Sequence, residues 1–125
     1  MATIALGKDS FEEKVEKSGI LLIDWWASWC GPCKAFAPIY ERMAEKHPEA
    51  LFAKIDVDAE PELAEAFEIR SIPTLMLLRD SVLLFSRPGM LPEAALEELL
   101  TKAAAIDMDA IRKEISEREK AEHGG

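Results

Sequence analysis

The chain has 125 residues, of which 49% are apolar and 31% are charged, a composition typical of one globular domain. Its net charge of −9 at pH 7 disfavours nucleic acid and anionic membranes as primary partners, because both would repel it. No apolar run approaches the roughly 20 residues that cross a bilayer, and residues 1–10 lack a secretory pattern, so we expect a cytoplasmic protein.

The first half of the sequence predicts alternating strands and helices. A brief strand around residues 4–6 precedes a helix at Ser10-Phe-Glu-Glu13, which has the spacing of a capping box. Residues 20–26 are apolar on both alternating faces except for Asp24, and this pattern predicts a central strand with a buried aspartate. Apolar residues three and four apart predict a helix over residues 33–47.

The second half predicts a strand, a helix, a hairpin and another helix. Residues 51–57 form the expected strand, and Pro61 fits the first turn of the helix after it. Two apolar runs at 74–78 and 82–86 have a short connection typical of an antiparallel hairpin, and Pro92 then opens a helix. This order predicts an α/β fold in which a central mixed β-sheet has helices on both faces.

The composition at the end of the sequence indicates a charged extension. We expect a domain over residues 1–105 and an appendage over 106–125, in which residues 107–122 carry six acidic and four basic side chains. Its few apolar residues recur at helical spacing, which predicts one or two further amphipathic turns that pack modestly on the domain. Residues 123–125 are expected to fray.

The two cysteines of the chain lie in one motif, Cys30-Gly-Pro-Cys33, where a strand is followed by a helix. This spacing keeps the α-carbons within the disulfide range of roughly 4.4 to 6.8 Å, which indicates redox chemistry. The free amides and the dipole of a first helical turn favour a thiolate on Cys30, the expected nucleophile. Cys33 lies one turn deeper and is expected to resolve the mixed disulfide.

Other uses of the two thiols are disfavoured. Tetrahedral zinc needs four ligands and the chain offers only His47 and His123 as histidines, so we expect no metal. The Gly-Pro pair between the cysteines adds no charge or donor that would over-stabilise a thiolate, which favours a reductant over an oxidant or isomerase.

The segment from Trp25 to Lys34, Trp-Trp-Ala-Ser-Trp-Cys-Gly-Pro-Cys-Lys, resembles the active-site segment of the thioredoxin family. The resemblance covers residues 3–105 and implies a thioredoxin-like fold. It also implies a protein-disulfide reductase that has no bound cofactor, serves cell redox homeostasis and is recharged by a thioredoxin reductase. Further matching positions are Asp24, the family's buried aspartate; Lys54, the lysine that faces it; Pro38 in the helix; Ile72-Pro73-Thr74, the cis-proline loop; and Gly89, beside the substrate groove.

Asp24 has two interpretations that are compatible. Burial of a carboxyl group raises its pKa, which suits Asp24 to exchange a proton with Cys33. Alternatively, Asp24 is a structural partner of Lys54, because structural ion pairs also perturb pKa values.

The resemblance also implies a substrate surface. If the bond before Pro73 is cis, the backbone of Ile72 can pair with an extended substrate as an added strand. Of the neighbouring aromatic residues, Trp25 is expected in the core, whereas the sequence leaves Trp26 undecided. The expected contact residues are Trp29, Gly31, Pro32, Ile72, Pro73, Gly89 and Met90.

Three features depart from the family's pattern: Ser28 replaces a frequent acid, which would alter partner preference, Ser71 replaces a frequent glycine, and the hairpin turn Asp80-Ser81 lacks glycine. None touches the sulfur chemistry.

We expect a monomer acting on disulfide-containing proteins. A rival hypothesis is an interaction module in which the surface or the extension docks one partner and redox turnover is incidental.

Overall fold

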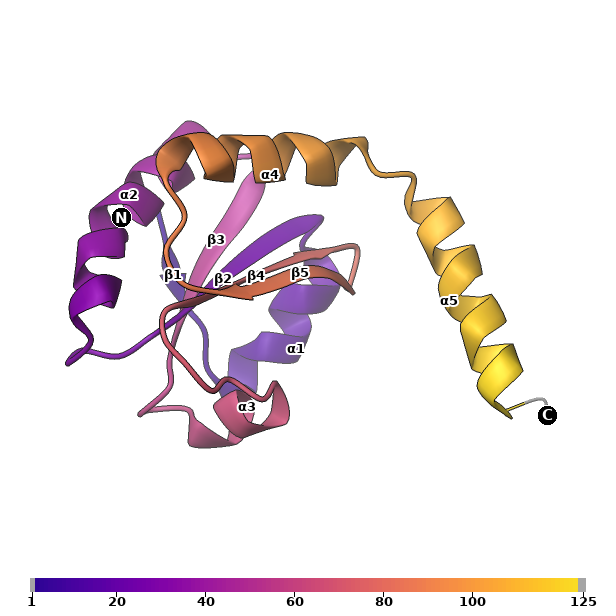
Figure 1. Cartoon of the computed structure of the whole chain (residues 1–125), viewed down its shortest axis with the longest axis horizontal. Helices are drawn as coiled ribbons and strands as arrows, with labels where there is room; N and C mark the ends of the chain where they lie inside the picture. Colours follow the sequence, from indigo (N-terminus) through magenta and orange to yellow (C-terminus); the bar gives the residue numbers. More distant parts are fainter. Residues whose placement is uncertain (1, 124–125) are drawn as a thin grey trace.

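The computed structural model describes residues 2–123 and contains a five-stranded mixed sheet with helices on both faces (Figure 1). The sheet has the order β1-β3-β2-β4-β5, which confirms the expected α/β fold. The strands are β1 (Ile4–Ala5), β2 (Ile20–Trp26), β3 (Ala50–Asp56), β4 (Thr74–Arg79) and β5 (Val82–Pro88). The helices are α1 (Lys8–Lys17), α2 (Gly31–Lys46), α3 (Pro61–Ala66), α4 (Glu93–Ala105) and α5 (Met108–His123).

The central strand β2 contributes to both halves of the core because successive side chains of a strand point to opposite faces. Leu22 packs with the residues of α2 and α4 on one face. Leu21, Ile23 and Trp25 pack on the other face, where α1 and α3 lie (Figure 1). The expected core position of Trp25 is therefore confirmed.

The strand directions bring three segments to one end of the sheet. Strands β2 and β3 are parallel and β4 is antiparallel to β2, so the carboxyl ends of β2 and β3 lie beside the start of β4. The cysteine motif follows β2, residues 57–58 follow β3, and residues 72–73 precede β4. We call this the cysteine end, and the opposite end, which holds the β4–β5 turn, the turn end.

The start of α1 differs from the expected capping box. The helix begins at Lys8 with Gly7 as its N-cap, and Ser10 is the third helical residue. The Gly7 amide donates a hydrogen bond to Ser10 Oγ at 3.1 Å. The prediction that Ser10 is the N-cap was therefore wrong. Ser10 takes the third helical position, and its hydroxyl accepts the hydrogen bond from the amide of the actual N-cap, Gly7.

The extension forms a longer helix than predicted. Helix α5 has 16 residues, whereas one or two turns were expected. The Asp107 carboxylate accepts hydrogen bonds from the amides of Asp109 and Ala110 and thereby caps it. Exposed ion pairs, such as Arg118 with Glu114, support its surface. The predicted length was too short because it was based on apolar residues alone, which do not reveal these polar contacts.

The modest packing expected for the extension is confirmed. Met108 is buried, Ile111 is half-buried and Ile115 is exposed, and α5 projects away from the sheet (Figure 1). His123 ends α5, and the remainder of the residues expected to fray, 124 and 125, lies outside the described range. None of the helices in residues 2–123 has the length and apolarity that crossing a membrane requires.

The β4–β5 turn keeps its tight geometry without glycine. Asp80 and Ser81 have φ values of 51° and 70°, in the left-handed region that glycine usually occupies in such turns. The Asp80 amide donates to the Gly19 carbonyl at 2.8 Å, which fixes the turn against the start of β2.

Candidate active site

The two cysteines form a disulfide at the start of α2. Cys30 is the N-cap of the helix, and the Cys33 amide donates to Cys30 Sγ at 3.2 Å. Their α-carbons are 5.2 Å apart, as the spacing predicts. A helical amide directed at Cys30 Sγ is the contact that stabilises a thiolate when the disulfide is reduced.

Burial does not distinguish the two cysteines in this oxidised state. Cys30 is 4% exposed and Cys33 is 3% exposed, so the expected outer position of Cys30 rests on its place at the cap. Trp29 is 68% exposed and precedes the motif. Within residues 2–123 we find no group of three or more His, Cys, Asp or Glu side chains arranged to hold a metal ion.

The loop before β4 lies against the motif. The Ile72–Pro73 bond is cis, as the resemblance implies, and the Ile72 carbonyl oxygen is 3.7 Å from Cys30 Sγ. The Gly89 amide donates to the Pro73 carbonyl at 2.8 Å, and Gly89 has a φ of 99° that favours glycine. Ser71, the departure from the family's pattern, accepts a hydrogen bond from Thr74 Oγ through its carbonyl.

Most of the expected contact residues are accessible at this end. Ile72 is half-buried, and Pro73 is buried, so the Pro73 ring offers a partner little surface. The exposed members are Trp29, Gly31, Pro32, Gly89 and Met90.

Asp24 is buried in β2, as predicted. It is 1% exposed, and neither carboxylate oxygen has a hydrogen-bond partner among the described residues. Burial raises the pKa of Asp24 from 3.8 to about 7, and the positive charge of Lys54 opposes that rise. A carboxyl group with this pKa can exchange a proton at neutral pH.

Lys54 lies opposite Asp24 in the β2–β3 register without forming an ion pair with it in the described part of the chain. Its Nζ lies instead 4.6 Å from the centroid of the Trp26 ring, a cation–π contact. Trp26, which the sequence left undecided, is half-buried and packs against the cysteines. Lys54 therefore acts on Asp24 through its charge rather than through direct contact.

Two residues after β3 belong to the site and were missed by the sequence analysis. Val57 packs against the buried cluster of Ala27, Cys30 and Cys33. Asp58 accepts a hydrogen bond from Trp29 Nε1 at 2.8 Å. No motif marks either residue, but the carboxyl ends of parallel neighbouring strands meet at one end of a sheet, which is a usable signal.

Comparisons with known proteins agree with this geometry. The family model described as Thioredoxin matches residues 2–102. A putative thioredoxin 2 of Streptomyces coelicolor is 49% identical over 118 residues, 94% of this chain and 88% of the relative. A thioredoxin of Staphylococcus haemolyticus is 40% identical over 103 residues, 82% of this chain and 98% of the relative.

A solved structure supports the same assignment. A mutant thioredoxin from Halobacterium salinarum has a TM-score of 0.78 and 32% identity, and the match covers 84% of this chain and 93% of that one. The paired cysteines at the start of α2 occupy the place of the family's redox-active motif. The chain therefore belongs to the thioredoxin family of thiol–disulfide oxidoreductases.

Proposed function

We propose that this protein reduces protein disulfides with Cys30 as the nucleophile and Cys33 as the resolving thiol. The observation that carries the assignment is the hydrogen bond from the Cys33 amide to Cys30 Sγ at the N-cap of α2. That contact stabilises negative charge on Cys30, and the thiolate is the attacking form.

The reaction has two exchanges. The Cys30 thiolate attacks one sulfur of the substrate disulfide, which forms a mixed disulfide and releases the other substrate sulfur as a thiolate. Cys33, once deprotonated, attacks Cys30 Sγ, forms the Cys30–Cys33 disulfide and releases the second substrate thiolate. The substrate gains two electrons and the protein loses two, which a thioredoxin reductase restores.

Asp24 is the proposed acceptor of the Cys33 proton. Its burial and its pKa of about 7 support this role, as do its two carboxylate oxygens, which have no hydrogen-bond partner within the described part of the chain. Lys54 is a positioning charge in this proposal, since it lowers the pKa of Asp24 towards the working range.

The proposed substrate surface surrounds the motif. An extended segment of the substrate pairs with the backbone of Ile72, whose carbonyl oxygen lies beside Cys30 Sγ. The side-chain and backbone surface that receives it is formed by Trp29, Gly31, Pro32, Ile72, Pro73, Gly89 and Met90.

We further propose that residues 1–105 are the working domain and that residues 106–125 are an appendage without a part in the exchange. The family match, which ends at residue 102, supports this division. The confinement of both cysteines to one motif supports a reducing compartment, the cytoplasm, and a role in electron transport and redox homeostasis. We expect a monomer that acts without nucleic acid or membrane.

Single cysteine variants test the mechanism. Cys33→Ser should hold substrate as a mixed disulfide, because the thiol that expels it is absent, whereas Cys30→Ser should neither attack nor trap. Both should lose turnover with insulin and dithiothreitol by at least a factor of about 1000, the scale of removing a nucleophile. Mass spectrometry identifies the adduct.

The opposite pattern of trapping would reverse the assignment of the two thiols. A wild-type protein that binds disulfide proteins without reducing them would favour the interaction module instead.

A further inference from the structure

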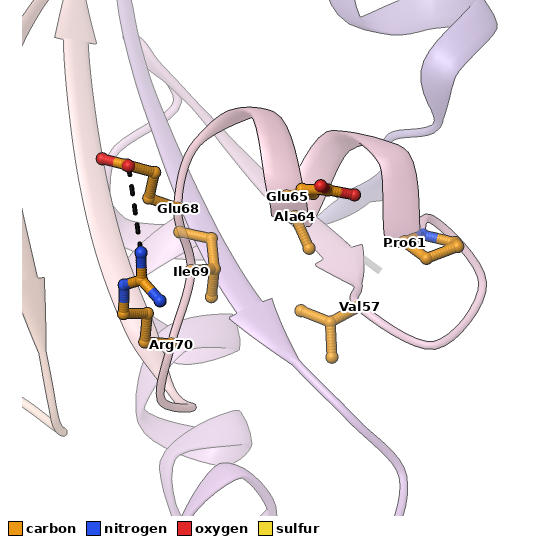
Figure 2. Close-up of a pocket in the computed structure, with 7 residues that line it drawn as sticks. All are labelled: Val57, Pro61, Ala64, Glu65, Glu68, Ile69 and Arg70. Carbon is orange, nitrogen blue, oxygen red and sulfur yellow. Dashed lines mark ion pairs between the residues drawn. The ribbon is translucent and has the colours of Figure 1, made fainter.

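A surface groove of about 570 Å³ adjoins the cysteine end, between α3 and the segment that leads into the cis-proline loop (Figure 2). Its floor is apolar and consists of Val57, Ala64 and Ile69, all half-buried. Glu65 and Glu68 stand at its rim. The exchange reaction described above uses none of the rim residues.

The groove is continuous with the redox site. Val57 lines the groove and also packs against the cluster that contains Cys30 and Cys33. Arg70 lies at one side of the groove, two residues before Ile72, the proposed pairing partner of the substrate. A segment bound across the cysteines can therefore extend towards the groove.

Among the described residues that line the groove, two glutamates, Glu65 and Glu68, face one cation, Arg70, so the lining has a net negative charge. The Glu65 carboxylate forms no hydrogen bond or ion pair among the described residues. Glu68 has one ion pair, with Arg70 at 3.9 Å, and both side chains are about four-fifths exposed (Figure 2). Such an exposed pair is weak, so both carboxylates stay available to a cation from a partner. The net charge of −9 adds to this preference.

We propose that the groove selects substrates, and that it takes an apolar side chain followed by lysine or arginine in the segment that flanks the reacting cysteine. This inference rests on the proposed disulfide reduction. The apolar side chain buries surface against the floor, and the cationic groups lie near Glu65 and Glu68. A flanking segment rich in acidic residues is repelled by the same two carboxylates.

Peptides with an internal disulfide test the proposal. Each set has three peptides that differ only in a flanking arm, which is Leu-Lys-Lys, Leu-Gln-Gln or Leu-Glu-Glu. One set has the arm before the first cysteine, and the other has it after the second. The protein is reduced with dithiothreitol and desalted, the reaction is quenched with acid, and mass spectrometry gives second-order rate constants. In at least one set, the lysine arm should react about threefold to tenfold faster than the glutamate arm, the range for one or two exposed ion pairs.

The decisive variant is Glu65→Gln/Glu68→Gln, in which the lysine-to-glutamate rate ratio should fall towards 1. Glutamine is chosen because Glu68 has a φ of 53°, and a change of shape there would disturb the backbone. The matched control is Glu117→Gln/Glu119→Gln on α5, which lies apart from α3 (Figure 1). It changes the net charge by the same amount and should keep the wild-type ratio.

The outcomes separate this inference from the proposed function. A wild-type ratio near 1, a ratio unchanged in the groove variant, or an equal loss in the α5 control would overturn the groove's role while peptide reduction continued. A ratio that falls only in the groove variant, and that also declines as salt screens the charges, supports it. Wild-type protein that reduced neither the peptides nor insulin would overturn the proposed function and this inference together.

Discussion

The two ends of the sheet differ in whether their charged side chains have hydrogen-bond partners. At the cysteine end, Asp24 is buried and finds no hydrogen-bond partner in residues 2–123. At the turn end, Arg79 Nη1 donates to the carbonyls of Ala103 and Ile106 at 2.7 Å, which closes the end of α4. An uncompensated buried carboxylate destabilises a fold, whereas a satisfied guanidinium stabilises it. The difference indicates that the cysteine end maintains reactivity and the turn end maintains stability.

The same contrast applies to the histidine at the turn end. His47 Nδ1 lies 2.7 Å from a Glu49 oxygen, and Nε2 lies 2.9 Å from the Glu97 carboxylate. Carboxylates only accept hydrogen bonds, so a doubly protonated ring satisfies both contacts. The hydrogen bond to Glu97, followed by that to Glu49, raises the pKa of His47. The His47 charge is compensated by two direct contacts, whereas Asp24 has only the more distant charge of Lys54.

Asp24→Asn should have the largest effect on stability. The folded state holds the Asp24 proton up to a pKa of about 7, whereas the unfolded state releases it near 3.8, so the wild type loses stability as pH rises from about 4 to 7. The full loss corresponds to about 4 kcal/mol above that window. At pH 8 the free energy of unfolding of the variant should exceed that of the wild type by at least several tenths of this loss, and chemical denaturation measures the difference.

The same variant should also resolve mixed disulfides more slowly, because Cys33 loses its proton acceptor. Glu117→Gln, on the exposed surface of α5, serves as the control and should change neither property. Turnover that matched the wild type from pH 6 to pH 8 would remove Asp24 from the mechanism.

Arg79→Leu tests the turn end. It removes the donors to the last carbonyls of α4 and should lower the free energy of unfolding by about 2 kcal/mol, as for hydrogen bonds to a charged group. Disulfide reduction should be retained at temperatures where the variant is folded. Arg112→Leu, which removes an exposed side chain near the same turn, should cost less than about 0.5 kcal/mol. Equal losses in the two variants would contradict the special role of Arg79.

His47→Asn should change stability by up to about 1 kcal/mol. A raised pKa in the folded state means that the stabilisation is complete below the unfolded value near 6.5 and disappears as pH rises through the folded pKa. Asp24 produces a slope of the same sign, so the measurement belongs in the Asp24→Asn background. There, denaturation curves at pH 6 and pH 9 should differ with His47 present and converge without it. Convergence in both proteins would show that the two glutamates do not hold the ring.

Ser81→Gly should produce the smallest change, a gain of up to about 1 kcal/mol. Ser81 has a φ of 70°, a conformation that costs a residue with a Cβ roughly 1 kcal/mol, and glycine removes that cost in part. Ser86→Gly within β5 is the matched control, and it should lose about 0.5 to 1 kcal/mol because glycine weakens a strand. A loss in both variants would mean that the Ser81 hydroxyl, which donates to the Val15 carbonyl, matters more than the backbone.

Sequence periodicity was sufficient to predict the strands of the sheet and the burial of Asp24. A strand that is apolar on both faces is covered on both sides, so a carboxyl group within it is buried too. The cis state of the Ile72–Pro73 bond was predicted from the resemblance alone, because only about 5–6% of X-Pro bonds in folded proteins are cis.

The contacts that the sequence analysis missed join residues far apart in the chain. Asp58 reaches Trp29, Arg79 reaches the end of α4, and His47 reaches Glu97. Each contact depends on how the elements are placed in space, and none leaves a local pattern. The length of α5 was missed for another reason: its support comes from polar caps and ion pairs, whereas the periodicity method counts apolar positions.

The position of β2 in the middle of the sheet has a consequence for biosynthesis. Its two neighbours, β3 and β4, both come later in the chain, and the second of them begins only at Thr74. Pairings between such distant segments form slowly, since loop closure must precede them. A nascent chain therefore emerges from the ribosome with Cys30 and Cys33 uncovered, and they stay so until β4 has been synthesised.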